Sequence, residues 1–195
     1  MRNFEAIYED MKAHGMKLPY DRVRIRLKGA NEALREGMDY ILRQQGRETI
    51  WLPEYERVSN WLSDNEGRGL MLMGGCGLGK TILGMYVLPG LILHSTRLVT
   101  RCYTAQEMNE RPDEVVAKRI VSLDDVGTEE ISIKYGERRN VFAEVMDNAE
   151  KKGNLVIATT NLNGDGLRQR YGDRVIDRIR STMRVIPLNG NSMRK

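Results

Sequence analysis

The sequence predicts an α/β fold in which helices cover both faces of a parallel sheet. Two observations carry this prediction. Short apolar segments follow one another from Gly69 onward, and amphipathic segments of helical period separate them. Strands of a parallel sheet form nearly continuous apolar runs, because both of their faces are covered. The five predicted strands are LMLM at 70–73, RLVTRCY at 97–103, RIVSLDD at 119–125, NLVIATT at 154–160 and MRVIPL at 183–188.

The composition of the 195 residues, with 41% apolar and 30% charged residues, suits one compact domain. The longest apolar run covers residues 86–93, and it is shorter than the roughly 20 residues that a membrane span needs. The segment MRNFEAIYEDMK carries acids where a signal peptide has an apolar core, so we expect a cytoplasmic protein with no membrane partner. Cys76 and Cys102 lack the spacing of a zinc site.

Residues 1–47 are predicted to form a short helical and basic arm that precedes one domain at 48–195. Apolar residues at helical spacing within the arm are Leu34, Met38, Ile41 and Leu42. The stretch DRVRIRLK at 21–28 alternates apolar with basic residues, which fits either an edge strand or an extended basic arm.

The positive charge is concentrated near the end of the sequence. The net charge is +4, and residues 168–195 hold eight basic and two acidic residues. This segment therefore carries +6, and residues 1–167 sum to −2. Such a segment could contact phosphates, or it could be a solvated helix face with internal Asp–Arg pairs.

A phosphate-binding motif follows the first predicted strand. The sequence GGCGLGKT satisfies G-x-x-x-x-G-K-[ST] in full, and the helical stretch ILGMYVL comes directly after it. Glycines allow successive backbone N–H groups to converge on an anion, the lysine adds a point charge at the phosphates, and the threonine hydroxyl can bind Mg²⁺. The motif consists of Gly74, Gly75, Cys76, Gly77, Leu78, Gly79, Lys80 and Thr81.

Polar side chains follow two further predicted strands. Asp124 and Asp125 emerge at the carboxyl end of RIVSLDD, where open α/β sheets bind their ligands. We expect Asp124 to hold Mg²⁺ opposite Thr81, and Asp125 to polarise the water that attacks the nucleotide. Asn161 ends NLVIATT, and its amide can orient that water or contact the γ-phosphate.

The order of these motifs resembles that of the AAA+ ATPases, a class of P-loop NTPases with an ASCE core. The segments YERVSNWL, IVSLDDVG, VIATTNLNGDGL, YGDRVIDRIRSTMRVI and GNSMR are similar to the DnaC/IstB branch, over about residues 48–195. The resemblance implies a three-layer α/β/α domain that binds ATP with Mg²⁺. Asn161 then matches sensor 1, Arg178 the arginine finger that reaches a neighbouring subunit's nucleotide, and Arg194 the terminal arginine assigned to sensor 2.

The arginines near the carboxyl terminus also show a pattern of their own. Three of them recur every four residues and are predicted to share one helix face, namely Arg170, Arg174 and Arg178. Three apolar residues are predicted to point toward the sheet, namely Val175, Ile176 and Ile179. An exposed guanidinium on this face can complete the site of a second copy, which requires a homo-oligomer. Alternatively, Asp173 and Asp177 neutralise the helix as ordinary surface pairs.

We therefore expect an ATP-hydrolysing helicase loader of bacterial or phage type, which assembles with ATP and delivers a DnaB-type replicative helicase to single-stranded DNA. Residues 1–47 would contact the helicase. The segment at 105–118 is shorter than the DNA-facing segment of the family, which leaves DNA binding as an open question. The alternatives are an IstB-like transposition helper that binds duplex DNA, a small-molecule P-loop kinase, and a regulator that binds nucleotide without turnover.

Overall fold

The computed structural model describes residues 3–129, 132–134, 137–190 and 192. Within these residues the helical segments are α1 (Phe4–Ala13), α2 (Ala30–Gln44), α3 (Tyr55–Ser63), α4 (Lys80–Ile82), the π-helical turn η1 (Leu83–Val87), α5 (Leu88–Thr96), α6 (Ala105–Glu110), α7 (Pro112–Val116), α8 (Val141–Lys152), α9 (Gly164–Tyr171) and α10 (Asp173–Thr182). The strands are β1 (Gly69–Met73), β2 (Arg101–Thr104), β3 (Ile120–Asp124), β4 (Ser132–Lys134), β5 (Glu137–Arg139), β6 (Leu155–Thr160) and β7 (Met183–Pro187). No helix in these ranges is long and apolar enough to cross a membrane.

A five-stranded parallel sheet in the order β2-β3-β6-β1-β7 forms the centre of the molecule. All five strands fall on the apolar segments that the sequence predicts, so the α/β class and the parallel sheet are confirmed. The second strand is shorter than predicted, because residues 97–100 precede it without strand pairing and Arg97 has a left-handed backbone that ends α5. The short strands β4 and β5 form a separate antiparallel pair.

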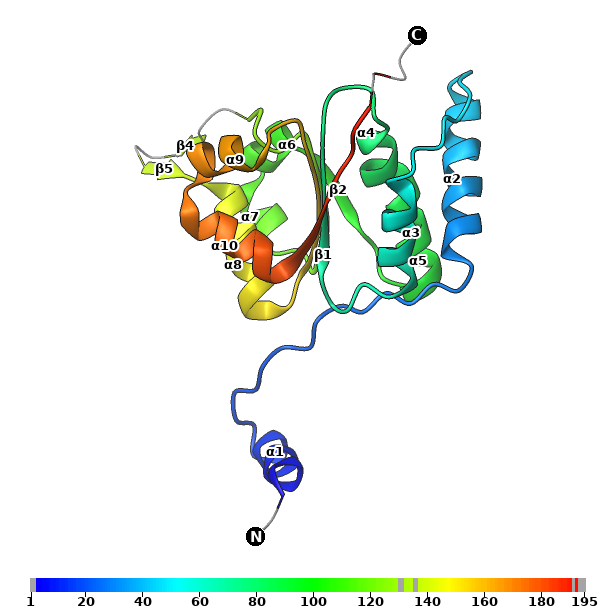
Figure 1. Cartoon of the computed structure of the whole chain (residues 1–195). Helices are drawn as coiled ribbons and strands as arrows, with labels where there is room; N and C mark the ends of the chain where they lie inside the picture. The colour runs from blue at the N-terminus through cyan, green and yellow to red at the C-terminus, as the bar shows by residue number, and fades with distance from the viewer. Residues whose placement is uncertain (1–2, 130–131, 135–136, 191, 193–195) are drawn as a thin grey trace.

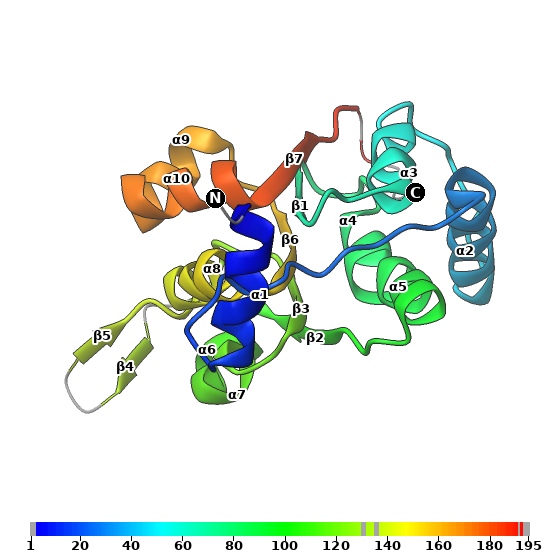
Figure 2. The same ribbon diagram turned by 90° about the horizontal axis from the view of Figure 1, so that it is seen from below.

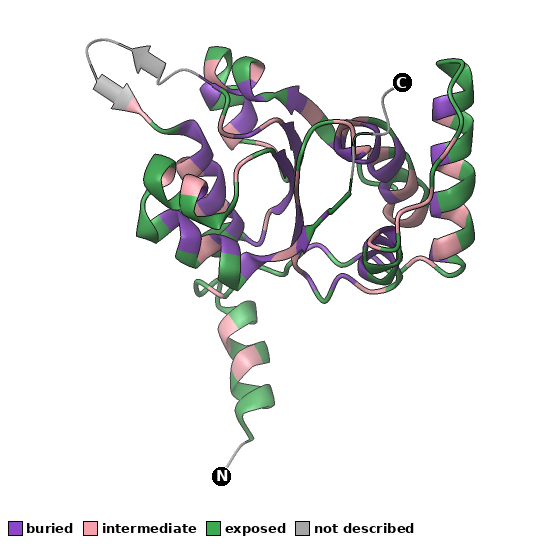
Figure 3. Ribbon diagram, turned by 45° about the horizontal axis from the view of Figure 1, so that its top comes forward, coloured by how far each residue is buried: buried purple, intermediate pink, exposed green. Residues whose placement is uncertain are grey.

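Helices cover both faces of this sheet (Figure 1). On one face, α2, α3 and the α4–η1–α5 stretch pack together, and on the other face lie α6 to α10. The buried residues accordingly form two clusters, one on each side of the sheet, and Figure 3 shows the buried segments facing the sheet from both layers. This arrangement is the three-layer architecture expected from the sequence.

Helix α2 belongs to the folded body, which differs from the arm expected over residues 1–47. Its side chains Leu34, Met38 and Leu42 are buried in the same cluster as Tyr55 and Trp61 of α3. The amphipathic period of α2 thus reflects packing against α3 and η1, because an apolar helical face must be buried somewhere. Helix α1 stands apart from the body in Figure 1, and none of its residues is buried.

The register of the strands brings the ends of three of them together. Met73, the last residue of β1, pairs with Thr160 of β6, and Leu123 of β3 pairs with Ala158 of the same strand. The phosphate-binding motif, Asp124 and Asn161 therefore leave the sheet at one edge. In an open parallel sheet this carboxyl edge is where ligands bind.

Candidate nucleotide-binding site

A cavity of about 320 Å³ lies over the glycine-rich loop that joins β1 to α4. The loop contributes one wall, and Asp125 and Asn161 contribute another from the ends of the two neighbouring strands. The third wall comes from α2, the segment that follows it and η1. Lining residues from the loop and its helix are Cys76, Gly77, Leu78, Gly79, Lys80, Thr81, Ile82 and Tyr86, and those from α2 and beyond are Met38, Leu42, Gln45, Arg47, Glu48 and Ile50.

Lys80 is buried at the base of this loop, with an exposed fraction of 6%. Its Nζ donates hydrogen bonds to the carbonyl oxygens of Gly74, at 2.9 Å, and Gly75, at 2.7 Å. A third bond of 2.8 Å runs to Oδ1 of Asn161. A buried ammonium needs such acceptors, because a charge removed from water without partners is costly. The lysine charge is thereby held between the phosphate loop and the end of β6.

Asn161 connects this lysine to Asp125. Its Nδ2 donates to Oδ1 of Asp125 over 3.0 Å, while its Oδ1 accepts from Lys80. The backbone of Asp125 is left-handed, with φ of 57°, and its N–H donates to Oγ1 of Thr159 over 2.9 Å. Lysine, amide and carboxylate thus form one hydrogen-bonded series across the ends of β1, β6 and β3.

Asp124 occupies a different environment from its neighbour. Its carboxylate is buried and accepts a hydrogen bond of 2.6 Å from the Thr159 hydroxyl, and it is not among the residues that line the cavity. Asp125 and Thr81 both line the cavity. Mg²⁺ in phosphate sites is held by one or two carboxylates together with the phosphates. The Thr81 hydroxyl and the carboxylates of Asp124 and Asp125 are therefore a set of donors that fits the ion.

Tyr55 supports the loop from beneath. Its side chain is fully buried, and the hydroxyl donates to the carbonyl of Leu78 over 3.0 Å. Burial raises the pKa of Tyr55, so the hydroxyl stays protonated and remains a donor. Sequence analysis missed this contact and also the wall from α2. The amphipathic period of α2 was the available signal, since it indicated an apolar face that needs a partner.

The last described residue also contacts the loop. A Cβ added at Gly77 would lie 2.1 Å from Oγ of Ser192, so only glycine fits at this close approach. The segment after β7 therefore returns to the phosphate loop. Arg194, the expected sensor 2 residue, lies outside the described residues.

The predicted arginine face is divided in the structure, and this part of the prediction is wrong. Gly172, with φ of 83°, ends α9 and precedes α10, so Arg170 stands on a different helix from Arg174 and Arg178. Glycine adopts this backbone without the penalty that other residues meet. The apolar residues of α10 do face the interior as predicted, namely Val175, Ile176 and Ile179.

Arg178 forms ion pairs within its own chain. Its Nε lies 2.5 Å from Oδ1 of Asp147 and 3.4 Å from Oε2 of Glu150, both on α8, and 12% of its side chain is exposed. Arg174 also contacts Asp147, over 2.8 Å, but 67% of its side chain is exposed. The acidic residues that pair with Arg174 and Arg178 thus lie on α8. The expected partner Asp177 is not among them.

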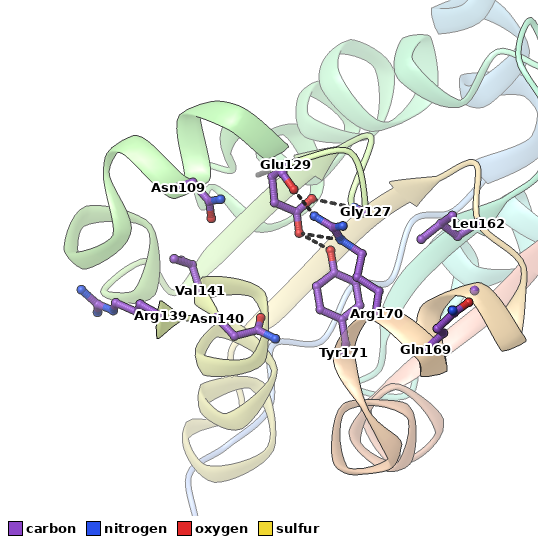
Figure 4. Close-up of a pocket in the computed structure, with 11 residues that line it drawn as sticks. Asn109, Gly127, Glu129, Arg139, Asn140, Val141, Leu162, Gln169, Arg170 and Tyr171 are labelled. Atoms are coloured by element: carbon purple, nitrogen blue, oxygen red, sulfur yellow. Dashed lines mark hydrogen bonds and ion pairs between the residues drawn. The ribbon is translucent and has the colours of Figure 1, made fainter. Parts of the chain in front are cut away.

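A second cavity, of about 590 Å³, lies beyond the loop that follows Asp125 (Figure 4). Buried Glu129 is at its centre and accepts hydrogen bonds from the Gly127 N–H, at 2.7 Å, and from the Tyr171 hydroxyl. Arg170 lies 3.5 Å from the same carboxylate and donates to the Glu129 carbonyl. Burial, together with the bond to Glu129, raises the pKa of Tyr171. This cluster fastens the loop after Asp125 to α9.

The chain was compared with protein families, curated proteins and solved structures. No family model matches it, and no curated protein matches its sequence. A DnaC helicase loader has a similar structure, with a TM-score of 0.63 and 17% identity over 81% of this chain and 99% of that one. A DnaI structure is similar over 65% and 73%, with 22% identity and a TM-score of 0.52.

AMPPCP-bound DnaA from Aquifex aeolicus is also similar, with a TM-score of 0.53 and 17% identity over 75% of this chain and 50% of that one. Each of these likenesses concerns the arrangement of the sheet and its helices. The phosphate loop, the aspartate pair and the strand-terminal asparagine stand at one edge of that sheet. The chain therefore shares the α/β fold of these DnaC, DnaI and DnaA structures.

Proposed function

We propose that this chain is a Mg²⁺-dependent ATPase that acts in DNA replication as a helicase loader. The single observation that carries the ATPase part is the series Lys80–Asn161–Asp125, which joins the phosphate loop to the aspartate pair on one cavity. The likeness to a DnaC helicase loader, which extends over 99% of that chain, supports the replication part.

Each group of residues in the cavity has its own role in hydrolysis. The N–H groups of the glycine-rich loop bind the phosphate oxygens, and the Lys80 ammonium exchanges its carbonyl partners for the β- and γ-phosphates. Asp125 accepts a proton from the attacking water, and Asn161 holds that carboxylate in place through its amide. Thr81 and Asp124 would hold Mg²⁺, which would neutralise phosphate charge when bound, and Asp124 would have to turn from the Thr159 hydroxyl toward the cavity to do so.

Residues from α2 and the segment after it also line the cavity. Met38, Leu42 and Ile50 provide an apolar wall, and Gln45 and Glu48 provide polar groups beside it. Such a mixture suits a nucleobase, because ligand pockets are mostly apolar with a few polar groups that fix orientation. The base of the nucleotide therefore occupies the side of the cavity formed by α2.

Assembly requires Arg178 to change partners. As an arginine finger it leaves Asp147 and Glu150 and enters the cavity of a neighbouring copy, where a guanidinium stabilises the charge of phosphoryl transfer. The cost of breaking these ion pairs opposes the exchange in an isolated subunit. Hydrolysis is consequently slow until copies of the chain assemble with ATP.

Helix α1 is the part of the chain that we assign to the helicase. Its apolar side chains share one face at helical spacing, yet none of them is buried, and Phe4 and Ile7 are 72% and 40% exposed. A helix that presents an apolar face without covering it can bury that face in the groove of a partner. The partner we propose is a ring-shaped DnaB-type helicase.

Two experiments test the two parts of the proposal separately. For the ATPase, binding of mant-ATP and release of phosphate are measured with Mg²⁺ for the parent, for Lys80→Ala and for Arg57→Ala, an exposed residue on α3 that serves as the control. We expect loss of binding in Lys80→Ala alone. Equal binding by all three proteins would contradict the nucleotide site.

For the loader function, a DnaB-type helicase is mixed with the full chain or with a chain that lacks residues 1–16, and complexes are weighed by native mass spectrometry. We expect a complex with the full chain only, because the deleted helix contributes nothing to the core. The truncated chain should retain mant-ATP binding. Absence of any complex with the full chain would contradict the loader function and leave the ATPase proposal standing.

A further inference from the structure

A third cavity, of about 440 Å³, lies at the edge of the sheet opposite the phosphate loop. Three of its seven lining residues are arginines, and none of the seven is acidic. They come from the extended segment before α2, from the end of α5 and the loop after it, and from the residue before β3. The lining residues are Val23, Arg24, Arg26, Ser95, Thr96, Leu98 and Arg119.

In the extended segment at 22–28, exposed basic residues alternate with residues that face the interior. Val23 and Ile25 are buried, with exposed fractions of 7% and 0%, and the basic residues between and beside them are exposed. In an extended chain alternate side chains point to opposite sides, so burial of one set turns the other set outward. The outward residues are Arg22, Arg24, Arg26 and Lys28.

Buried Asn65 holds the backbone of this segment. Its Oδ1 accepts from the Ile25 N–H over 2.8 Å, and its Nδ2 donates to the Val23 carbonyl over 3.1 Å. The Leu27 N–H donates to the carbonyl of Leu62 over 3.0 Å. The segment is therefore fastened to the body although it forms no strand, and its row of cations is placed before any ligand arrives.

Arg119 fixes the far side of the cavity. Its guanidinium donates to the backbone carbonyls of Asp21 and Lys152, and it lies 3.3 Å from Oδ1 of Asn154. These three partners are neutral acceptors, so none of them offsets the charge of the guanidinium. One carboxylate pairs with the row, that of Asp64, 3.4 Å from Nε of Arg26 with the two side chains 44% and 67% exposed. Such an exposed pair contributes little and is readily exchanged.

We propose that this surface, consisting of residues 22–28 and the arginine cavity, binds the phosphate backbone of a nucleic-acid strand. Alternate residues of an extended chain are about 6.6 Å apart, so the segment offers a regular line of single charges. A repeating line of phosphates matches this regularity, and the guanidinium fork binds phosphate oxygens in pairs. Leu98, 43% exposed in the same cavity, offers an apolar contact to a sugar or base.

The position of the surface separates it from the nucleotide site. In Figure 2, seen from below, the segment between α1 and α2 crosses beneath the strands from one helical layer to the other. The phosphate loop lies at the opposite edge of the sheet, as Figure 1 shows. Nucleic acid on this surface and ATP in the cavity can therefore bind together, and the inference does not depend on the ATPase proposal.

The test measures binding of a fluorescent oligo-dT of 20 nucleotides by anisotropy, at several salt concentrations, for three proteins. The variant Arg24→Gln/Arg26→Gln removes two cations of the row, and Arg43→Gln/Arg57→Gln removes two exposed cations elsewhere and leaves the same net charge. Because all four side chains are exposed, the variants should keep the far-UV circular dichroism of the parent.

We expect the row variant to bind at least about tenfold more weakly than the parent. The slope of log K against log salt should fall by about 1.4, at about 0.7 for each phosphate contact on a single strand. The control variant should retain most of the affinity and slope. Equal affinities of the row variant and the control would overturn the proposal. Displacement of the oligonucleotide by poly-glutamate at equal charge concentration would likewise overturn it, and would assign the surface to an acidic protein.

Discussion

Replacement of Arg178 by alanine tests whether the ion pairs on α8 hold this arginine in the isolated subunit. The change leaves Asp147 without the contact at 2.5 Å and Glu150 without the contact at 3.4 Å. Exposed pairs contribute below about 1 kcal/mol, whereas loss of one partner from a buried pair costs about 3–5 kcal/mol. Because Arg178 is 12% exposed and its partners 26% and 37%, we expect an intermediate loss of about 2 kcal/mol.

Thermal unfolding of dilute, nucleotide-free protein measures this loss. For a chain of this size, a destabilisation of about 2 kcal/mol lowers Tm by about 4–8 °C. Arg174→Ala is the matched control, because Arg174 contacts the same Asp147 from a side chain that is 67% exposed. Its loss should stay below about 1 kcal/mol, which is below about 4 °C. If the Arg178→Ala protein has the same Tm as the parent, the ion pairs of this arginine with α8 do not stabilise the fold, and the reasoning is refuted.

Three further predictions follow from buried polar contacts. Lys80→Ala should weaken mant-ATP binding by at least about tenfold, because a charged hydrogen bond to phosphate contributes about 1.5–3 kcal/mol; unchanged titration curves would contradict this. Asn65→Ala should lower the free energy of unfolding by about 2–4 kcal/mol in urea, since its amide makes three buried and one partly buried hydrogen bond to backbone groups, and an unchanged urea midpoint would exclude the role. Tyr55→Phe should cost about 1 kcal/mol and also weaken mant-ATP binding, because the Leu78 carbonyl of the phosphate loop loses its donor; a variant with parental affinity would show that this bond does not shape the loop.

The strands could be predicted because each one carries its own signal. Segments such as IVSLD and LVIATT are buried over their whole length, as expected for mainly apolar strands in the middle of a parallel sheet. The position of the glycine-rich turn between β1 and α4 could also be predicted, since its glycines, lysine and threonine stand together in the chain. The order of the strands across the sheet is a different matter. It depends on which apolar faces meet, and no local pattern contains that information.

The positions that the sequence left open depend on partners far along the chain. Arg178 looked like an exposed finger because its acidic partners stand on α8, about thirty residues earlier. The stretch at 22–28 has the period of a strand, yet its backbone pairs with the side chain of Asn65 and not with another strand. Helix α2 looked like an arm because its apolar face fits many possible neighbours. In each of these cases the structure depends on a contact between residues far apart in the sequence, and local sequence patterns do not reveal such contacts.

The backbone at Asp125 determines which carboxylate this position can carry. Its φ of 57° lies in the left-handed region, which aspartate and asparagine enter more readily than other residues with a side chain. Glutamate would extend farther into the cavity, but it would add conformational strain at a residue that lines this cavity. Aspartate is therefore the acidic residue that causes the least backbone strain at this position. The substitution Asp125→Asn removes the negative charge and keeps a residue that accepts the same backbone conformation.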